Sequence, residues 1–163
     1  ALGLTMAELL AQFPRSGRVD WIGVRPARRA TLTDLDIVNI TLNGLEGDHG
    51  SKPGKRAVTL IQAEHLAAMA SILGQDTLDP ARLRRNIVVS GINLLAIKDR
   101  QFQIGTAMLT GTGICAPCSR MEEEFGPGGY NAVRGHGGIT AEVIDPGIVR
   151  RGDPVSVRID ESA

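Results

Sequence analysis

The sequence predicts a mainly β fold with some α (α+β), in which short strands form a strongly curved or closed β-barrel with a few peripheral helices. Three observations lead to this prediction: many short β-rich segments, few helical patterns, and 20 glycines, which suit tight turns between strands. Closure is expected because a barrel removes the exposed edges that so many short strands would otherwise present. The length of 163 residues fits one ordinary hydrophobic core, so a single domain is expected over residues 1–163.

The amino-terminal half of the chain predicts a short helix, three strands and a longer helix. Residues 6–13 have helical periodicity, and the turn residues from Pro14 to Gly17 end it. Residues 62–73 form the clearest amphipathic helix, with apolar side chains at helical spacing and Gly74 as its stop. Strands are expected where apolar and β-branched residues alternate or cluster, over residues 18–24, 36–42 and 57–61.

The carboxy-terminal half predicts short elements only. A helical turn over residues 79–83 begins with Asp79 as its cap and Pro80 at its first position. Residues 121–125 predict another helical turn, with acidic residues near its start. Strands are expected over residues 86–90, over a hairpin formed by 102–105 and 107–110, and over 139–144 and 155–159.

Composition narrows the class of partner. Eighteen basic residues balance eighteen acidic ones, so no overall charge draws the chain to nucleic acid or to a membrane surface. No stretch approaches the roughly 20 apolar residues of a membrane span. The first residues lack the basic start of a secretory signal, and two cysteines do not make a secreted disulfide framework. We therefore expect a cytoplasmic chain that binds neither nucleic acid nor membrane.

Both cysteines lie in residues 114–121, which read Ile-Cys-Ala-Pro-Cys-Ser-Arg-Met, just before a glycine-rich stretch over residues 126–138. The thiolate is the reactive form of cysteine, and its pKa falls at a helix start or beside a cation. Cys118 lies three residues before the predicted helical turn, and Arg120 is close to it. These residues favour a reactive thiol at Cys118.

Other interpretations of the cysteine pair stay open. A zinc site would need two more ligands, and the three histidines are scattered at His49, His65 and His136. A thioredoxin-type redox pair would need a βαβ setting, which the irregular order of elements does not favour. Two small buried hydrophobic side chains are an equally good interpretation of the spacing alone.

Two basic segments are candidate anion sites. Residues 44–50 read Gly-Leu-Glu-Gly-Asp-His-Gly and are followed by Lys55 and Arg56, so backbone amides and cations could meet an anion there. This is not a phosphate-binding GxxxxGK[ST] loop, and a polar surface turn is the alternative. Residues 134–138, Arg-Gly-His-Gly-Gly, have the composition of an anion-binding nest, with an ordinary loop as the alternative.

The basic run Arg84-Arg85-Asn86 leads directly into a predicted strand. Neighbouring residues of a strand face opposite sides, so one of the two arginines would reach into a pocket. The guanidinium fork suits two-point contact with phosphate or carboxylate. A solvated basic helix end is the alternative, and His65 on the amphipathic helix is expected to be structural.

Taken in order, these segments resemble the MOSC domain, the carboxy-terminal module of molybdenum cofactor sulfurases, which also occurs alone and in amidoxime-reducing enzymes. No single piece is specific, but the ordered set covers nearly the whole chain. The matching pieces are Val-Asp-Trp-Ile-Gly-Val at 19–24, Gly-Leu-Glu-Gly-Asp-His at 44–49, Val-Thr-Leu-Ile at 58–61, Arg-Arg-Asn-Ile at 84–87, Ser-Gly-Ile-Asn-Leu at 90–94, Ile104-Gly105, Pro117-Cys118, Gly-Gly-Ile at 137–139 and Gly-Asp-Pro-Val at 152–155.

The resemblance implies a β-barrel-like domain in which Cys118 is the catalytic residue and the thiolate ligand of molybdenum in a pterin cofactor. Soft, deprotonated sulfur suits such a metal centre. Pyridoxal phosphate is not expected. The turn Gly-Asp-His-Gly lacks the arginine of the family's Gly-Asp-Arg-His, which removes one anion contact. The residues expected to bind the cofactor are Asp48, His49, Lys55, Arg56, Arg85, Asn86, Arg134 and His136.

Three functions follow from the resemblance. The first is a molybdenum-dependent oxidoreductase that reduces an N-hydroxylated or oxidised small substrate with electrons from an external reductase. The second is a sulfur carrier or cofactor-handling protein with a persulfide on Cys118, supplied by a sulfur donor protein, and Cys115 could resolve such a species by forming a disulfide. The third is a non-catalytic pterin- or anion-binding domain. The chain lacks the amino-terminal domain and the carboxy-terminal helical extension of some members, so we expect a minimal domain that either binds less of the cofactor or completes its pocket with a partner. A homodimer is among the expected partners.

Overall fold

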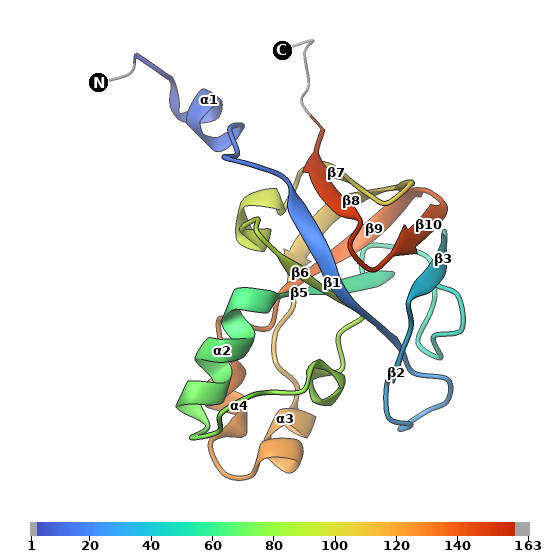
Figure 1. Cartoon of the computed structure of the whole chain (residues 1–163), viewed down its shortest axis with the longest axis vertical. Coiled ribbons are helices and arrows are strands. Elements are labelled where there is room, and N and C mark those ends of the chain that lie inside the picture. Colours follow the sequence, from blue (N-terminus) through green and yellow to red (C-terminus); the bar gives the residue numbers. More distant parts are fainter. Residues whose placement is uncertain (1–2, 159–163) are drawn as a thin grey trace.

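In the computed structural model, which describes residues 3–158, a seven-stranded β-barrel forms the body of the molecule (Figure 1). All neighbouring strands of the barrel are antiparallel except β5 and β6, and pairing of β1 with β11 closes the ring. The closed barrel with a few helices confirms the predicted fold class. Around the ring the strands are β1 (Gly17–Val24), β11 (Pro154–Val157), β7 (Gln101–Ile104), β8 (Ala107–Ile114), β9 (Ile139–Asp145), β5 (Val58–Gln62) and β6 (Ile87–Ser90).

A second, three-stranded sheet lies against one side of the barrel. Its order is β10 (Gly147–Arg150), β3 (Ile37–Thr41) and β4 (Gly44–Leu45), and the short β2 (Thr33–Asp34) pairs with the end of β1. The buried residues of β3 and β10, Val38, Ile40 and Val149, belong to the barrel core. The small sheet therefore extends the same core.

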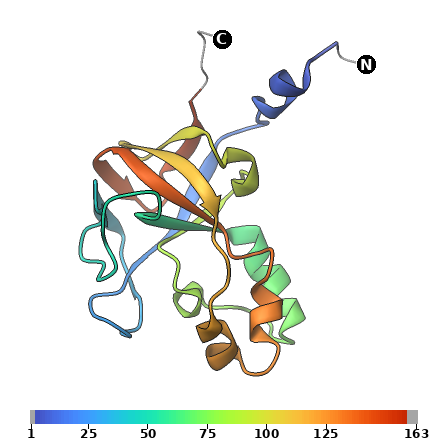
Figure 2. The same cartoon turned by 180° about the vertical axis from the view of Figure 1, so that it is seen from behind.

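The helices gather below the barrel, except the first (Figure 2). Helix α2 (Ala63–Ile72) connects the parallel strands β5 and β6, and α3 (Ser119–Phe125) and α4 (Gly129–Val133) lie beside it. Two 3-10 turns, η1 (Pro80–Leu83) and η2 (Leu94–Ile97), flank β6. Helix α1 (Met6–Leu10) stands away from the barrel and has no buried residue. No helix within residues 3–158 is long and apolar enough to cross a membrane.

The second half of β1 and the strands β5 and β6 bury residues on both faces because they separate two cores. Ile22, Leu60 and Ile87 point into the barrel, whose core includes Phe102. On the other face, Trp21, Ile61 and Val88 pack with the helices, against buried residues such as Met69, Leu83, Met121 and Val133. This second core attaches η1 and the helices α2, α3 and α4 to the outside of the barrel, and α3 begins at the cysteine loop.

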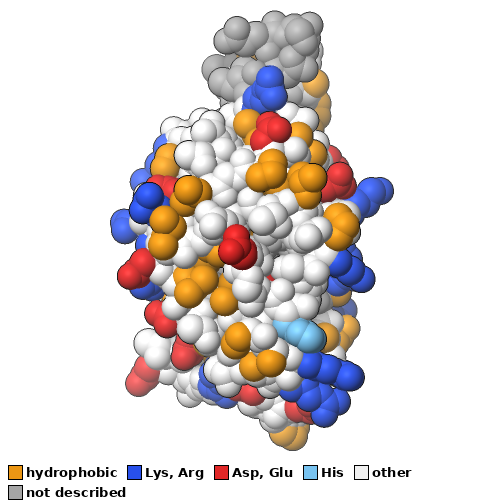
Figure 3. Space-filling view, turned by 90° about the vertical axis from the view of Figure 1, so that its right-hand side faces the viewer, with side chains coloured by type: hydrophobic (Ala, Val, Ile, Leu, Met, Phe, Trp, Pro, Cys, Tyr) orange, Lys and Arg blue, Asp and Glu red, His pale blue; other side chains and the backbone are white. Residues whose placement is uncertain are grey.

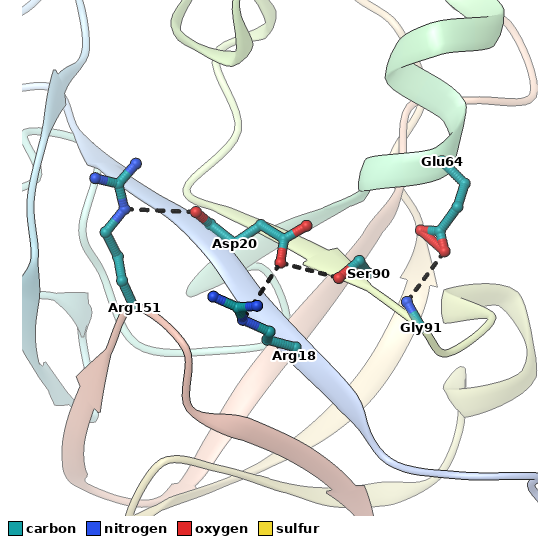
Figure 4. A network of polar contacts seen from close by, with 6 residues as sticks. All are labelled: Arg18, Asp20, Glu64, Ser90, Gly91 and Arg151. Atoms are coloured by element: carbon teal, nitrogen blue, oxygen red, sulfur yellow. Dashed lines mark hydrogen bonds and ion pairs between the residues drawn. The ribbon is translucent and has the colours of Figure 1, made fainter.

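Polar contacts join the middle of β1 to the end of β6, and the residue after β6 to the start of α2 (Figure 4). The Asp20 carboxylate accepts a hydrogen bond from Ser90 Oγ at 2.9 Å, and Glu64 Oε2 accepts one from the Gly91 amide at 3.0 Å. Gln62 Nε2 donates to the other oxygen of Glu64 at 2.9 Å. Burial raises the pKa of Glu64, but the hydrogen bonds from Gln62 and Gly91 outweigh it, so the pKa lies below its ordinary value.

Most predicted elements are present, with shifted ends. The first helix stops at Leu10 instead of residue 13, and the hairpin strand expected over residues 107–110 continues to Ile114. The glycine-rich stretch over residues 126–138, for which no helix was predicted, contains α4, and β10 was not predicted. The last strand ends at Val157, and residue 159 of the predicted strand lies outside the described residues.

Candidate functional site

Cys118 is exposed at the end of the loop that leads from β8 to α3. It is the residue that precedes the first turn of α3, and its carbonyl oxygen accepts a hydrogen bond from the Met121 amide at 2.9 Å. Cys115 is buried, and its amide donates to the Gly138 carbonyl at 2.8 Å. Both cysteines are free. The loop therefore presents the sulfur of Cys118 to solvent and keeps Cys115 inside.

The buried Arg85 holds this loop through three backbone carbonyls. Its Nε donates to Gly137 O at 2.8 Å, one terminal nitrogen donates to Leu83 O at 3.3 Å, and the other donates to Ala116 O at 3.1 Å. The side chain is 6% exposed. Because charged donors make the stronger hydrogen bonds, Arg85 ties the start of β6, the cysteine loop and the loop before β9 into one unit.

Two glycines allow the loop before β9 to lie against the cysteine loop. A Cβ atom at Gly137 would overlap the carbonyl of Cys115, and one at Gly138 would overlap the carbonyl of Leu60 in β5. Gly138 also has a φ of +87°, which disfavours other residues. Close backbone approach, and not an anion nest, accounts for this pair of glycines.

A cleft of about 150 Å³, here called the inner cleft, lies next to this assembly. Asn86 and Thr59 form its floor: Asn86 Oδ1 accepts from the Thr59 hydroxyl at 3.2 Å and from the Thr59 amide at 3.3 Å, and Asn86 Nδ2 donates to Gly23 O at 3.2 Å. The cleft is defined by the polar residues Arg25, Asp48, Arg56, Thr59, Arg84 and Asn86. Three arginines against one aspartate make it a cationic site.

The Gly-Asp-His turn attaches to Arg25 at the rim of the inner cleft. Asp48 Oδ1 accepts from the Arg25 amide at 2.8 Å, and the His49 amide donates to Arg25 O at 2.6 Å. The side-chain Nε of Arg25 is buried and has no hydrogen-bond partner among residues 3–158. An unpaired buried donor on a cationic side chain is costly. An anionic ligand in the cleft would satisfy it.

A second cavity of about 280 Å³, here called the outer groove, adjoins the inner cleft and shares Arg84 and Leu32 with it. It lies between η1, α3 and the segment before β2. Figure 3 shows the side of the molecule that carries β2 and β3, where several basic side chains lie next to and below a histidine. The charged residues that line the outer groove are Arg29, Arg82, Arg84, Arg120, Glu123 and Glu124.

The structure brings together only some of the residues expected to bind a cofactor. Asp48, Arg56 and Asn86 line the inner cleft. His49 is exposed and contributes its amide, and Lys55 is exposed and accepts a hydrogen bond from Thr112 at its carbonyl. For the strand-entry arginines, the alternation argument left the choice open and the resemblance named Arg85. In the structure Arg84 lines the cleft and Arg85 is turned to the three carbonyls.

Arg134 and His136 lie apart from the cleft residues, on the α4 side. Arg134 donates to Asn131 Oδ1 at 3.3 Å. His136 makes an edge-to-face contact with His65, with ring centroids 4.8 Å apart, and its Nδ1 is buried without a partner in the described part of the chain. Burial, with a smaller repulsion from His136, lowers the pKa of His65 below its ordinary value.

Comparison with known proteins assigns the family. A sequence model of the MOSC domain matches residues 39–156. The chain belongs to the MOSC domain family. Similar solved structures include YuaD from Bacillus subtilis (19% identity, TM-score 0.76, covering 88% of this chain and 96% of that chain) and YiiM from Escherichia coli (21% identity, TM-score 0.70, covering 90% and 71%). YiiM from Geobacillus stearothermophilus is similar too, at 17% identity with a TM-score of 0.71, covering 88% and 75%. At these identities the likeness concerns the fold, and no curated protein matched.

Sequence reasoning missed several residues of this MOSC domain that face the two cavities. Arg25 and Arg29 follow β1 as part of an Arg-rich turn, and Thr59 alternates with the core residues of β5. The sequence signal for Arg84 was its position directly after a capped helical turn. In the structure Arg84 itself adopts the left-handed conformation there, with a φ of +60°. Arg120 carried a signal as the cation nearest Cys118, but only the structure shows which cavity it lines.

Proposed function

We propose that this MOSC domain binds a molybdenum-pterin cofactor, with the Cys118 sulfur as the protein ligand of the metal and the inner cleft as the site of the cofactor's phosphate. The observation that carries the proposal is a cationic cleft in which the buried Arg25 Nε has no hydrogen-bond partner among residues 3–158. Arg85, which lies between the cleft residues Arg84 and Asn86, holds the loop that ends at the exposed Cys118. Thiolate is a suitable ligand for a soft metal centre, and arginines suit phosphate.

The donor set fits a cofactor that brings most of its own metal ligands. Within residues 3–158, no three His, Cys, Asp or Glu side chains group as a self-contained metal site would require. A single protein sulfur at Cys118 would then complete the coordination of a metal carried by the pterin. Arg25 and Arg56 would hold the phosphate, and Asn86 would keep the cleft floor in place through Thr59 and Gly23.

When bound, the molybdenum centre would supply two-electron redox chemistry to an N-hydroxylated or oxidised small substrate, with electrons from a separate reductase. The chain's own contribution is positioning. Arg85 fixes the loop that carries Cys118, and the buried Cys115 amide anchors that loop to Gly138. Asp48 holds the backbone of Arg25 so that its guanidinium stays at the rim of the inner cleft.

Cofactor retention tests the proposal. The protein is produced in a host that makes the pterin cofactor, and pterin is measured by fluorescence after denaturation, for the wild type and for Arg25→Gln, Arg56→Gln and Arg100→Gln. Arg100 lines neither cavity, so Arg100→Gln is the matched loss of one charge. We expect the two cleft variants to lose roughly tenfold or more of the bound pterin, since charge-assisted contacts to phosphate are the strong ones. Equal pterin in all four proteins, or none in any, would contradict the proposal.

The exposure of Cys118 also favours a second candidate, a sulfur carrier. In that reaction the Cys118 thiolate attacks the outer sulfur of a donor persulfide, a new S–S bond forms, and the donor cysteine leaves as a thiolate. Intact-mass spectrometry after incubation with a cysteine desulfurase and cysteine tests it: a gain of about 32 Da, one sulfur atom, is expected in the wild type. An adduct that persists in Cys118→Ser, or that never forms, would exclude this candidate.

A further inference from the structure

The outer groove contains three arginines that the proposed phosphate site does not require. Arg29, Arg84 and Arg120 come from the segment before β2, from the residue after η1 and from α3. None of the three side chains has a hydrogen bond or ion pair within residues 3–158. They converge from separate parts of the sequence on one cavity of about 280 Å³.

The fourth arginine of the outer groove is already occupied. Arg82 Nε donates to Glu124 Oε1 at 2.7 Å, its terminal nitrogen donates to Glu124 O at 3.2 Å, and its guanidinium lies over the Phe125 ring at 4.6 Å. This contact fastens the end of α3 to η1. Glu124 is neutralised by it, which leaves Glu123 as the acid opposing Arg29, Arg84 and Arg120 in the groove.

The backbone conformation of two of these arginines also supports a binding site in the outer groove. Arg29 and Arg84 both have positive φ, at 64° and 60°, and both line the groove. Non-glycine residues in this region cost of order 1 kcal/mol each and persist where the surrounding structure holds them. Two such residues of one type at one cavity indicate that the direction of their side chains matters.

Cys118 is close to the groove along the chain. Arg120 follows it by two residues in the first turn of α3, and Arg85, next to Arg84, holds Ala116 two residues before it. The groove and the inner cleft meet at Arg84. The phosphate of the proposed cofactor needs only the inner cleft, which already contains Arg25 and Arg56.

We propose that the outer groove is a substrate-recognition site that selects a small molecule with an oxyanionic group, a carboxylate or a phosphate, and places it beside Cys118. This assignment of substrate class rests on the proposed function. Arg29 and Arg120 hold the oxyanion, Arg84 separates it from the inner cleft, and Glu123 limits the affinity so that the product is released. The geometry therefore selects for anions among the oxidised small molecules that could react there.

Alkylation of Cys118 in the full chain tests the groove without a metal. Rates are measured with iodoacetate, which is anionic, and with iodoacetamide, which is neutral, and the labelled cysteine is located by peptide mass spectrometry. The ratio of the two rates removes the effect of the thiolate fraction, because both reagents attack the same thiolate. Electrostatic focusing in a cationic cleft raises the local concentration of anions by tenfold or more.

We expect Arg29→Gln, Arg84→Gln and Arg120→Gln each to lower the iodoacetate to iodoacetamide ratio by about threefold, and the triple variant by roughly tenfold or more. Glu123→Gln should raise the ratio, inorganic phosphate should lower it in the wild type, and Arg100→Gln should leave it unchanged. A change in Arg120→Gln alone would overturn the proposal, since that would reflect only the charge nearest Cys118. Equal ratios in all variants would overturn it too.

The same protein loaded with cofactor separates the substrate from a second anionic group of the cofactor. We expect the cofactor-loaded wild type to bind inorganic phosphate and the cofactor-loaded Arg29→Gln variant not to bind it. If the unloaded wild type binds phosphate but the loaded wild type does not, the substrate assignment is overturned. The alkylation ratio needs no molybdenum. It can therefore succeed where the metal proposal fails, and the two failures are distinguishable.

Discussion

Replacement of Arg85 by glutamine is the most informative perturbation of the loop that carries Cys118. The substitution removes a buried cation together with three hydrogen bonds, two of them buried and one partly buried. Hydrogen bonds from charged donors contribute roughly 1.5–3 kcal/mol each, and water can replace only the partly buried one, so we expect a loss of about 3–5 kcal/mol in the free energy of unfolding. Against a typical total of about 5–15 kcal/mol, this is a large fraction.

Urea denaturation followed by circular dichroism measures this loss, and thiol titration locates it. Arg85→Gln should make the buried Cys115 react with a thiol reagent at a rate approaching that of Cys118, because the loop that covers it is released. Arg85→Lys keeps the charge but has only one nitrogen in place of the three that reach the separate carbonyls, so a loss of about 2–3 kcal/mol is expected. Arg84→Gln is the matched control and should cost less than about 0.5 kcal/mol, as for a side chain without a partner. A loss for Arg85→Gln no larger than that of the control would refute the reasoning.

Three further predictions concern stability and proton binding. Gly138→Ala should lower the free energy of unfolding by about 2 kcal/mol or more in a urea titration, because the new Cβ meets the carbonyl of β5 at positive φ; an unchanged midpoint would contradict the close approach. Glu64→Gln should cost about 0.5–1 kcal/mol at neutral pH, a value reduced by exposure. Because the pKa of Glu64 is lowered from 4.5, this difference is present above that pH and should vanish as pH falls through the folded pKa; a constant difference down to acid pH would exclude the Gly91 contact. The pKa of His65, measured by NMR, should lie below 6.5 and rise in His136→Gln, and the stability of the wild type should fall as pH drops below 6.5; a normal pKa in both proteins would contradict the contact between the rings.

The barrel could be predicted because its signals are local. Alternation in β1 and the compact apolar run of β5 mark strands wherever they lie, and Asp79 caps the 3-10 turn as its sequence position implies, accepting from the Ala81 amide at 3.0 Å. The second core was less visible, because Trp21 and Ile61 look like members of one barrel core until α2 and α3 are placed over them. Helix α4 was hidden because glycines flank it and the five residues show no helical period.

Local sequence signals pointed to several residues of the candidate site but not to how they lie relative to one another. Cys118, Asp48, Arg56 and Asn86 carried local signals, and the structure places the last three in one cleft. Arg25 carried none, because its role depends on Asp48, which is 23 positions away and meets it only after the chain folds back. The distinction between Arg84 and Arg85 rests on one left-handed residue, which a strand-alternation argument does not include.

X-ray absorption at the molybdenum edge tests the central proposal most directly. Wild type and Cys118→Ser are purified from a cofactor-producing host, and the number of sulfur atoms bound to molybdenum is compared at matched pterin content. If Cys118 is the protein ligand, the wild type contains molybdenum with one more sulfur neighbour than the serine variant. The same sulfur count in both proteins, or the absence of molybdenum from the wild type, would contradict the account.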